Sequence, residues 1–237
     1  MGPCDGPSSG FGLTDMPRLA IVAALEREVR PLVKDWHATD QQHDGRRFRF
    51  FEKGEIILVC GGIGAAPARK ASEAAIALFD PQVICSAGFA GALDPKLKVG
   101  DLIHPAVVIN AGDGSRTMVN SGSGVLVSFA SVADPDQKRK LRDSFGAEIV
   151  DMEAAAVARS ADAHGKEFTA VKAISDEINF EFPAMDRFVD SEGRFLEGRF
   201  TLYTAIRPWL WPRVLQLGRN STRASRALCM YLRTISA

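Results

Sequence analysis

Three of the apolar stretches in this sequence are followed by pairs of acidic side chains. They are Glu26 and Glu28, Asp151 and Glu153, and Asp176 and Glu177. A carboxylate can accept hydrogen bonds from sugar hydroxyls, remove a proton from water, or donate a proton when its surroundings keep it protonated. The elements that carry these residues decide whether they can act together.

The stretch VDMEAAAVA, residues 150–158, places two of these acids at the start of an expected helix. The positive end of the helix dipole stabilises an anion in the first turn. The alanines that follow let the helix lie close to a sheet. Glu153 is therefore a candidate for binding ligand hydroxyls, while the alternative is a tightly packed helix whose acids have no functional role.

Two glycine-rich segments, GGIGAAP at 61–67 and AGFAGALDP at 87–95, follow other apolar stretches. Glycine lets a ligand approach the backbone, so Gly64 and Gly88 are candidate contacts. The first segment resembles a dinucleotide fingerprint, but Pro67 stands where the third glycine is needed, and no acid ends the next apolar stretch. The sequence therefore favours neither a Rossmann cofactor site nor a P-loop.

The positioning elements follow from hydrophobic patterning. Apolar, mostly non-alternating runs predict buried strands at 18–24, 55–62, 82–88, 101–109, 147–150 and 168–175. Helices are predicted between them, at 26–36, 66–79, 134–146 and 152–165. This alternation predicts an α/β fold, with a central twisted mixed β-sheet flanked by helices in three layers. Ligands in such folds gather at the carboxyl ends of the strands.

Composition excludes several classes of protein. Lys+Arg and Asp+Glu both number 29, so no net charge attracts nucleic acid, and no apolar run is long enough to span a membrane. The four cysteines form no CxxC pair, which favours a reducing cytoplasm. The four histidines lie in no metal-binding or triad motif, so we expect neither a metal nor an organic cofactor.

We expect three segments along the chain. Residues 1–16 are rich in Gly, Pro and Ser and are predicted to be a disordered extension, and residues 17–200 form the catalytic domain. Residues 201–237 hold six arginines, no acid, and Trp209 and Trp211, with a helix predicted at 221–235. Such a segment could bind peripherally to the inner face of an anionic membrane. The alternative is packing on its own domain or on a partner subunit.

The residues gathered so far resemble the nucleoside phosphorylase/nucleosidase superfamily. The likeness is closer to the 5′-methylthioadenosine/S-adenosylhomocysteine nucleosidases, whose five signature segments are similar to AIVAALEREVRPL, GGIGAAPA, SAGFAGALDPKLKVGD, VDMEAAAVA and VKAISDE. These span Arg18 to about Glu177 and occur in the family's order. The resemblance implies that family's fold, a homodimer, and a small purine nucleoside as substrate.

The resemblance also implies roles for five residues. Glu28 occupies the position that activates water, and Asp176, after Ser175, the position that protonates purine N7. Glu153, beside Met152, occupies the position that binds the ribose hydroxyls. Cleavage of the N-glycosidic bond needs an acid for the leaving purine and a base for water. We therefore expect a protonated Asp176 with a raised pKa, and ionised Glu28 and Glu153.

Three features depart from the nucleosidase pattern. Phe89 replaces a serine, and the segment from Asp101 to Val150 is shorter by about 30 residues. In this shortened segment, Phe129, Val132 and Ala133 are candidate base contacts, the alternative being ordinary core residues. The basic tail resembles that of the hopanoid-associated branch, which acts on adenosylhopane.

The first hypothesis is thus a hydrolase that releases adenine from an adenosyl compound. A phosphorylase is the alternative within the superfamily, with Arg30 or Arg69 recruited to bind phosphate. Against it, no arginine stands just before the second glycine segment, at 87–95. A non-catalytic nucleoside-binding module is a third hypothesis, but binding alone does not need a proton donor and a water base.

Overall fold

The computed structural model describes residues 19–181, 188, 190, 193–205 and 207–236. The extension predicted at residues 1–16 lies outside them. The strands are β1 (Leu19–Ala23), β2 (His37–His43), β3 (Arg46–Lys53), β4 (Ile56–Cys60), β5 (Val83–Ala92), β6 (Leu102–Ile103), β7 (Val107–Asn110), β8 (Arg116–Met118), β9 (Val125–Ser128), β10 (Ile149–Asp151) and β11 (Glu167–Asp176). The helices are α1 (Glu26–Val33), α2 (Ala65–Phe79), α3 (Pro135–Phe145), α4 (Ala154–Ala163), α5 (Glu197–Ala205) and α6 (Trp211–Ile235), with a short 3₁₀ helix, η2 (Pro208–Leu210).

The described strands form one mixed sheet, in the order β2-β3-β4-β1-β5-β10-β9-β7-β8. The strand β11 branches from this path, pairing parallel with β5 and antiparallel with β6. The strand β1 lies parallel to β4 and β5, so the carboxyl ends of β1, β5 and β11 meet at one edge. The predicted mixed sheet is confirmed.

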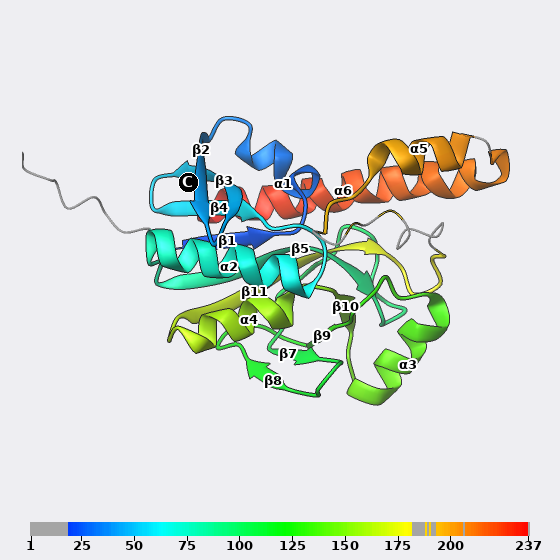
Figure 1. Ribbon diagram of the computed structural model, residues 1–237. Coiled ribbons are helices and arrows are strands. Elements are labelled where there is room, and N and C mark those ends of the chain that lie inside the picture. Colours follow the sequence, from blue (N-terminus) through cyan, green and yellow to red (C-terminus); the bar gives the residue numbers. More distant parts are fainter. Residues whose placement is uncertain (1–18, 182–187, 189, 191–192, 206, 237) are drawn as a thin grey trace, which may run out of the picture.

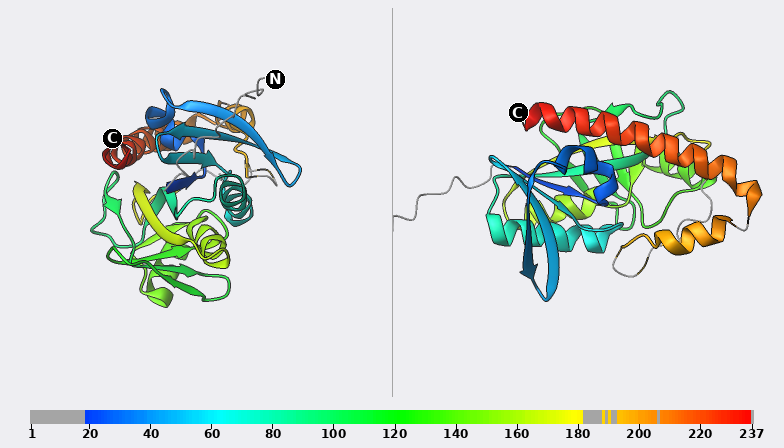
Figure 2. Two further views of the ribbon diagram at one scale, coloured as in Figure 1. Left: turned by 90° about the vertical axis from the view of Figure 1, so that its left-hand side faces the viewer. Right: turned by 90° about the horizontal axis from the view of Figure 1, so that it is seen from above.

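Helices cover both faces of the sheet, as Figures 1 and 2 show. Alanine-rich α2 and α4 pack on one face through side chains such as Ala71 and Ala158, both fully buried. The other face is covered by α1 and α6, whose Val29 and Leu228 belong to a second apolar cluster. The small alanines let α2 and α4 approach the strands closely, which brings the first turn of α4 to the sheet edge.

The helix boundaries follow local chemistry. Asp134 and Gln137 form a reciprocal capping box at the start of α3, and Gly146 ends the helix in the left-handed conformation, with a φ of 62°. These residues satisfy backbone groups that the helix leaves unpaired at its ends. The sequence prediction of a helix at 134–146 is therefore confirmed.

Three elements differ from the sequence prediction. The run at 101–109 is divided into β6 and β7 by the segment that contains Pro105, which lacks the backbone N–H that a continuous ladder needs. The glycine segment at 87–95 is largely strand, because β5 continues to Ala92 through pairing with β11 and β10. The helix predicted at 221–235 begins ten residues earlier, at Trp211, with Pro212 in its first turn.

The hairpin of β2 and β3 has no counterpart in the sequence prediction. Asp44 and Gly45 connect its strands with positive φ values of 47° and 73°. Such a turn matches the twist of antiparallel strands, and an Asp-Gly pair is the sequence pattern that favours it.

The C-terminal helix contributes to the core. Leu228, Cys229 and Leu232 are buried against α1 and β11, whereas Trp211 and Leu215 in its first half are more than half exposed. This first half runs beside α5 (Figure 1). The Trp211 indole donates to the Thr204 carbonyl at 3.0 Å. None of the described helices has both the length and the apolar character that crossing a bilayer requires. The division of the chain at residue 201 stays a prediction.

Candidate active site

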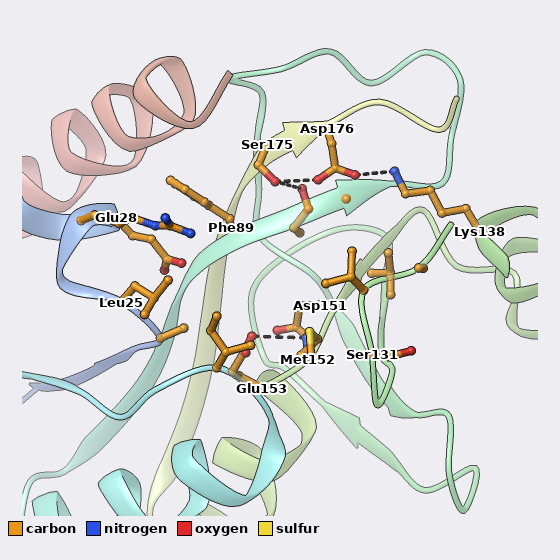
Figure 3. A pocket seen from close by; sticks show the side chains of 18 residues that line it. Leu25, Glu28, Phe89, Ser131, Lys138, Asp151, Met152, Glu153, Ser175 and Asp176 are labelled. Carbon is orange, nitrogen blue, oxygen red and sulfur yellow. Dashed lines mark hydrogen bonds and ion pairs between the residues drawn. The ribbon is translucent and has the colours of Figure 1, made fainter. Parts of the chain in front are cut away.

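A cavity of about 140 Å³ lies at the carboxyl ends of β1, β10 and β11 (Figure 3). Its lining comes from distant parts of the chain. The lining residues predicted from sequence are Glu28, Phe89, Val132, Ala133, Met152, Glu153, Ser175 and Asp176. The structure therefore brings the three candidate carboxylates to one place, as the hypothesis requires, while the role of each stays a prediction.

Phe129 and the two candidate glycines lie outside this lining. Phe129 lines a neighbouring cavity of about 400 Å³, which the Met152 side chain also borders. Gly64 and Gly88 instead lie against the carboxylates. A Cβ atom at Gly88 would stand 2.9 Å from Glu28 Oε2, so glycine is required there for the carboxylate to take its place.

Glu153 is held by two backbone amides. The Gly64 N–H donates to its Oε1 at 2.7 Å, and the Met152 N–H donates to its Oε2 at 3.2 Å. Gly64 has a φ of 97°, a conformation that disfavours other residues. The first glycine segment, residues 61–67, thus positions Glu153, 89 residues after Gly64 in sequence.

Asp151 explains why the stretch at 150–158 carries two acids. Its Oδ2 accepts the Ala154 N–H at 2.9 Å at the start of α4, and its Oδ1 accepts the Ser128 hydroxyl at 2.6 Å. This side chain therefore ties α4 to β9, leaving Glu153 to face the cavity.

Glu28 lies in the first turn of α1, is 5% exposed, and its Oε2 has no hydrogen-bond partner among the described residues. Burial, and secondly the negative charge of Glu153, raise the pKa of Glu28 to about 8. Burial and the charge of Asp151 raise the pKa of Glu153 to about 7. The expectation that both acids are fully ionised at neutral pH is therefore wrong, because they lie close together away from water.

Lys172 is a buried charged residue beside the candidate site that the sequence prediction missed. Its ammonium pairs with Asp151 at 2.8 Å and donates to the Ser86 hydroxyl at 3.0 Å. Burial alone would lower its pKa, but Asp151 and Glu153, with Glu28, raise it above the usual lysine value. The ammonium thus offsets part of the negative charge of the site. A charged residue within the otherwise apolar run FTAVKAIS was the available sequence signal.

Asp176 has partners on both of its carboxylate oxygens. The Ser175 hydroxyl donates to Oδ1 at 2.7 Å, and the Lys138 ammonium forms an ion pair with Oδ2 (Figure 3). Lys138 comes from α3 and lines the same cavity. The sequence prediction did not include this ion pair, and the expected protonation of Asp176 stays a prediction.

We expect Glu28→Gln to flatten the pH dependence of the free energy of unfolding. Between about pH 4.5 and pH 8 the folded state holds a proton on Glu28 that the unfolded state releases. The stability that this group contributes is thus fully present below pH 4.5 and is lost as the pH rises towards 8, at up to about 1.4 kcal/mol per pH unit. Denaturant unfolding across this range measures the slope, with the exposed neighbour Glu26→Gln as control. Equal slopes for Glu28→Gln and the wild type would contradict the assigned burial.

Among the described residues, no group of three or more His, Cys, Asp or Glu side chains is arranged to hold a metal ion. The chemistry that the cavity offers comes from carboxylates and lysines. The buried Glu28 carboxylate has one oxygen available to bind a ligand. The Glu153 carboxylate is held by two backbone amides, and the Asp176 carboxylate is paired with the Lys138 ammonium. This set can accept a proton on one side of a ligand and donate one on the other.

Comparisons with known proteins find nucleosidases among the relatives of this chain. The aminodeoxyfutalosine nucleosidase of Campylobacter jejuni is 23% identical over 214 residues, 73% of this chain and 92% of that protein. The 5′-methylthioadenosine/S-adenosylhomocysteine nucleosidase of Staphylococcus carnosus is 27% identical over 202 residues, 69% of this chain and 88% of its own length.

Solved structures share the fold. A Helicobacter pylori 5′-methylthioadenosine/S-adenosylhomocysteine nucleosidase superposes with a TM-score of 0.69 at 17% identity, covering 92% of this chain and 97% of that one. The S-adenosylhomocysteine nucleosidase of Streptococcus pyogenes gives 0.65 at 20% identity, covering 94% and 99%. The family model described as the phosphorylase superfamily matches residues 18–136 and 123–197, most of the chain. The chain therefore belongs to the phosphorylase superfamily, the superfamily of nucleoside phosphorylases and nucleosidases that its sequence resembles.

Proposed function

We propose that the protein is a purine nucleosidase, an N-glycosyl hydrolase that releases adenine from an adenosyl compound. The observation that carries this proposal is the convergence of Glu28, Glu153 and Asp176 on one cavity. Nucleosidases among the relatives support the same reaction class. Retention of a separate candidate base and candidate acid argues against a module that only binds nucleosides.

In this proposal the acid and the base act on opposite sides of the ribose. Asp176 delivers a proton to purine N7 as the bond to N9 breaks, because an unprotonated purine is a poor leaving group. The ribosyl carbon becomes positively charged, and the carboxylate of Glu153, which binds the ribose hydroxyls, stabilises that charge. Glu28 removes a proton from the water that attacks this carbon.

Glu28 suits the role of water base for two structural reasons. Its Oε2 is buried and has no hydrogen-bond partner among the described side chains and backbone groups, so it can accept a hydrogen bond from a bound water. Its pKa of about 8 makes it a stronger base than an exposed glutamate. A positive charge on the ribosyl carbon also favours ionisation of Glu28 once the nucleoside reacts.

The placement of the arginines favours water over phosphate as nucleophile. Arg30 is exposed on α1, and Arg69 pairs with Glu73 at 2.8 Å beside the neighbouring cavity. Neither residue lines the cavity that holds the carboxylates. Arg27 does line it, but Glu28 beside it would repel a phosphate when ionised.

The 5′ substituent distinguishes two candidate substrates. A methylthioadenosine-like or adenosylhomocysteine-like compound agrees with the name of the Staphylococcus carnosus relative. Adenosylhopane is the alternative, supported by the basic α6, where exposed Trp211 and Leu215 accompany Arg213 and Arg219. In that alternative this half of α6 rests on a membrane surface. The proposal places the enzyme in the cytoplasm, as a homodimer.

Release of free base tests the proposed function directly. Purified protein is incubated with methylthioadenosine, adenosylhomocysteine, adenosine, inosine and an adenosyl lipid, each with and without phosphate. We expect adenine from at least one adenosyl compound, at a rate that phosphate does not change. Strict dependence on phosphate would establish the phosphorylase alternative, and no release from any substrate would leave only the binding module.

A further inference from the structure

Lys138 is buried in an unusual setting. It lies on α3, a helix otherwise rich in exposed polar residues, yet it is only 1% exposed. Its neighbours Arg139 and Lys140 face solvent. A lysine is almost never fully buried unless a charged group pairs with it. We therefore expect a charged partner that compensates for the burial of the Lys138 ammonium.

That partner is Asp176, 38 residues later in the chain. The Lys138 ammonium pairs with Asp176 Oδ2 (Figure 3). It also donates to the Glu177 carbonyl at 2.8 Å. A Cβ atom at Gly91 of β5 would stand 2.8 Å from Asp176 Oδ2 and 3.2 Å from Lys138 Cε. The absence of a side chain on Gly91 thus leaves space for this contact, and a Cβ atom there would require Asp176 and Lys138 to shift.

The other charged groups around Lys138 have partners of their own. The Glu177 carboxylate pairs with Lys98 at 3.2 Å, and Arg139 on α3 pairs with Asp136. Lys172 pairs with Asp151, which also lines the cavity. Glu28, Glu153 and Arg27 line the cavity from α1 and the start of α4. Lys138 is therefore the cation placed against the candidate acid.

We propose that Lys138 is the source of the proton that Asp176 delivers to the leaving purine, an inference that rests on the proposed function. As the bond from C1′ to N9 breaks, its electron pair passes to the purine, and N7 becomes a stronger base than a carboxylate. Asp176 gives N7 a proton and takes one from the Lys138 ammonium, which becomes a neutral amine. Water adds to C1′ and gives its proton to Glu28, and solvent reprotonates Lys138 when the base leaves. Lys138 does not contact the purine in this scheme. It acts through Asp176, which it positions and to which it donates a proton.

Two substitutions of Lys138 distinguish two roles for this residue: donating a proton to Asp176, and holding the Asp176 side chain in place. Lys138→Arg keeps a positive charge beside Asp176, but a guanidinium does not release its proton in proteins. Lys138→Met removes the charge and keeps a long side chain. With an adenosyl nucleoside we expect both variants to lose about 10²-fold or more in kcat, the range of general acid catalysis. Lys140→Met, an exposed lysine on the same helix, is the matched control and should match the wild type.

A second substrate shows whether the loss concerns the proton. A p-nitrophenyl riboside with the same 5′ substituent has a leaving group that departs without protonation. We expect both Lys138 variants to hydrolyse it within about threefold of the wild-type rate. The ratio of the two turnover rates does not depend on how much of a variant is folded, so partial misfolding does not hide the result.

Each outcome decides the inference. Selective loss on the nucleoside in both variants supports it. Wild-type activity of Lys138→Arg on the nucleoside would show that the charge only holds Asp176, and equal losses on both substrates would show a structural role. Either of these results overturns proton supply by Lys138. If the wild type releases no purine at all, the proposed function itself fails, which is a different result.

Discussion

Replacing Asp176 with asparagine is expected to lower kcat for an adenosyl nucleoside by about 10²- to 10⁴-fold. An asparagine amide keeps the size of the side chain and still accepts a hydrogen bond from Lys138, but it cannot pass a proton to N7. The dissociation constant of the nucleoside should change little, because the ribose contacts proposed for Glu153 remain. Turnover is measured by adenine release and binding by calorimetry.

The substitution also has a cost in stability. It leaves the Lys138 ammonium buried without a carboxylate, and the loss of one partner of a buried ion pair typically costs about 3–5 kcal/mol. Turnover must therefore be compared at a temperature where the thermal melt shows the variant to be folded. Asp162→Asn, at the exposed end of α4, is the matched control for the chemical change. Full turnover in folded Asp176→Asn would remove Asp176 from the mechanism.

Replacing Glu28 with glutamine should lower kcat by a similar factor, about 10²- to 10⁴-fold, because it removes the proposed base instead of the proposed acid. The amide cannot remove a proton from water. The wild-type kcat/KM should rise with pH and level off above about pH 8, since the free enzyme must lose the proton on Glu28 before it can act as a base. In Glu28→Gln the residual activity should not show this rise.

The matched control is Glu26→Gln, in the same helical turn but exposed and outside the cavity lining. It should retain both the wild-type rate and the wild-type pH profile. If Glu28→Gln keeps a rate within about threefold of the wild type, water is activated by another group. A pH profile that stays unchanged in this variant would likewise assign the ionisation to a different residue.

The sequence by itself determined most of the elements that carry the site. Strands β1 and β4 are short, continuous apolar runs, a pattern typical of buried strands. The helix α3 is delimited by Asp134, Gln137 and Gly146, whose capping effects are local. Interactions of this kind involve residues close together in the chain, which is why sequence patterns reveal them.

The sequence also determined, through the order of its motifs, that Glu28, Glu153 and Asp176 follow elements whose ends meet. Its pattern did not predict the β2–β3 hairpin, where the Asp44-Gly45 turn connects strands that are mostly polar on one side. It also did not identify the end of β5, because Gly88 to Ala92 look like a turn until β10 and β11 pair with them.

The protonation chemistry of the site was decided only by the tertiary structure. The pKa of Glu28 depends on burial and on the charges of Glu153 and Lys172, all far away in sequence. The pairing of Lys138 with Asp176 depends on how α3 folds against the end of β11. Electrostatic interactions act through space and strengthen where water is excluded, so no local pattern encodes them. The sequence therefore indicates which carboxylates come together, whereas the packing around them determines which of them hold a proton.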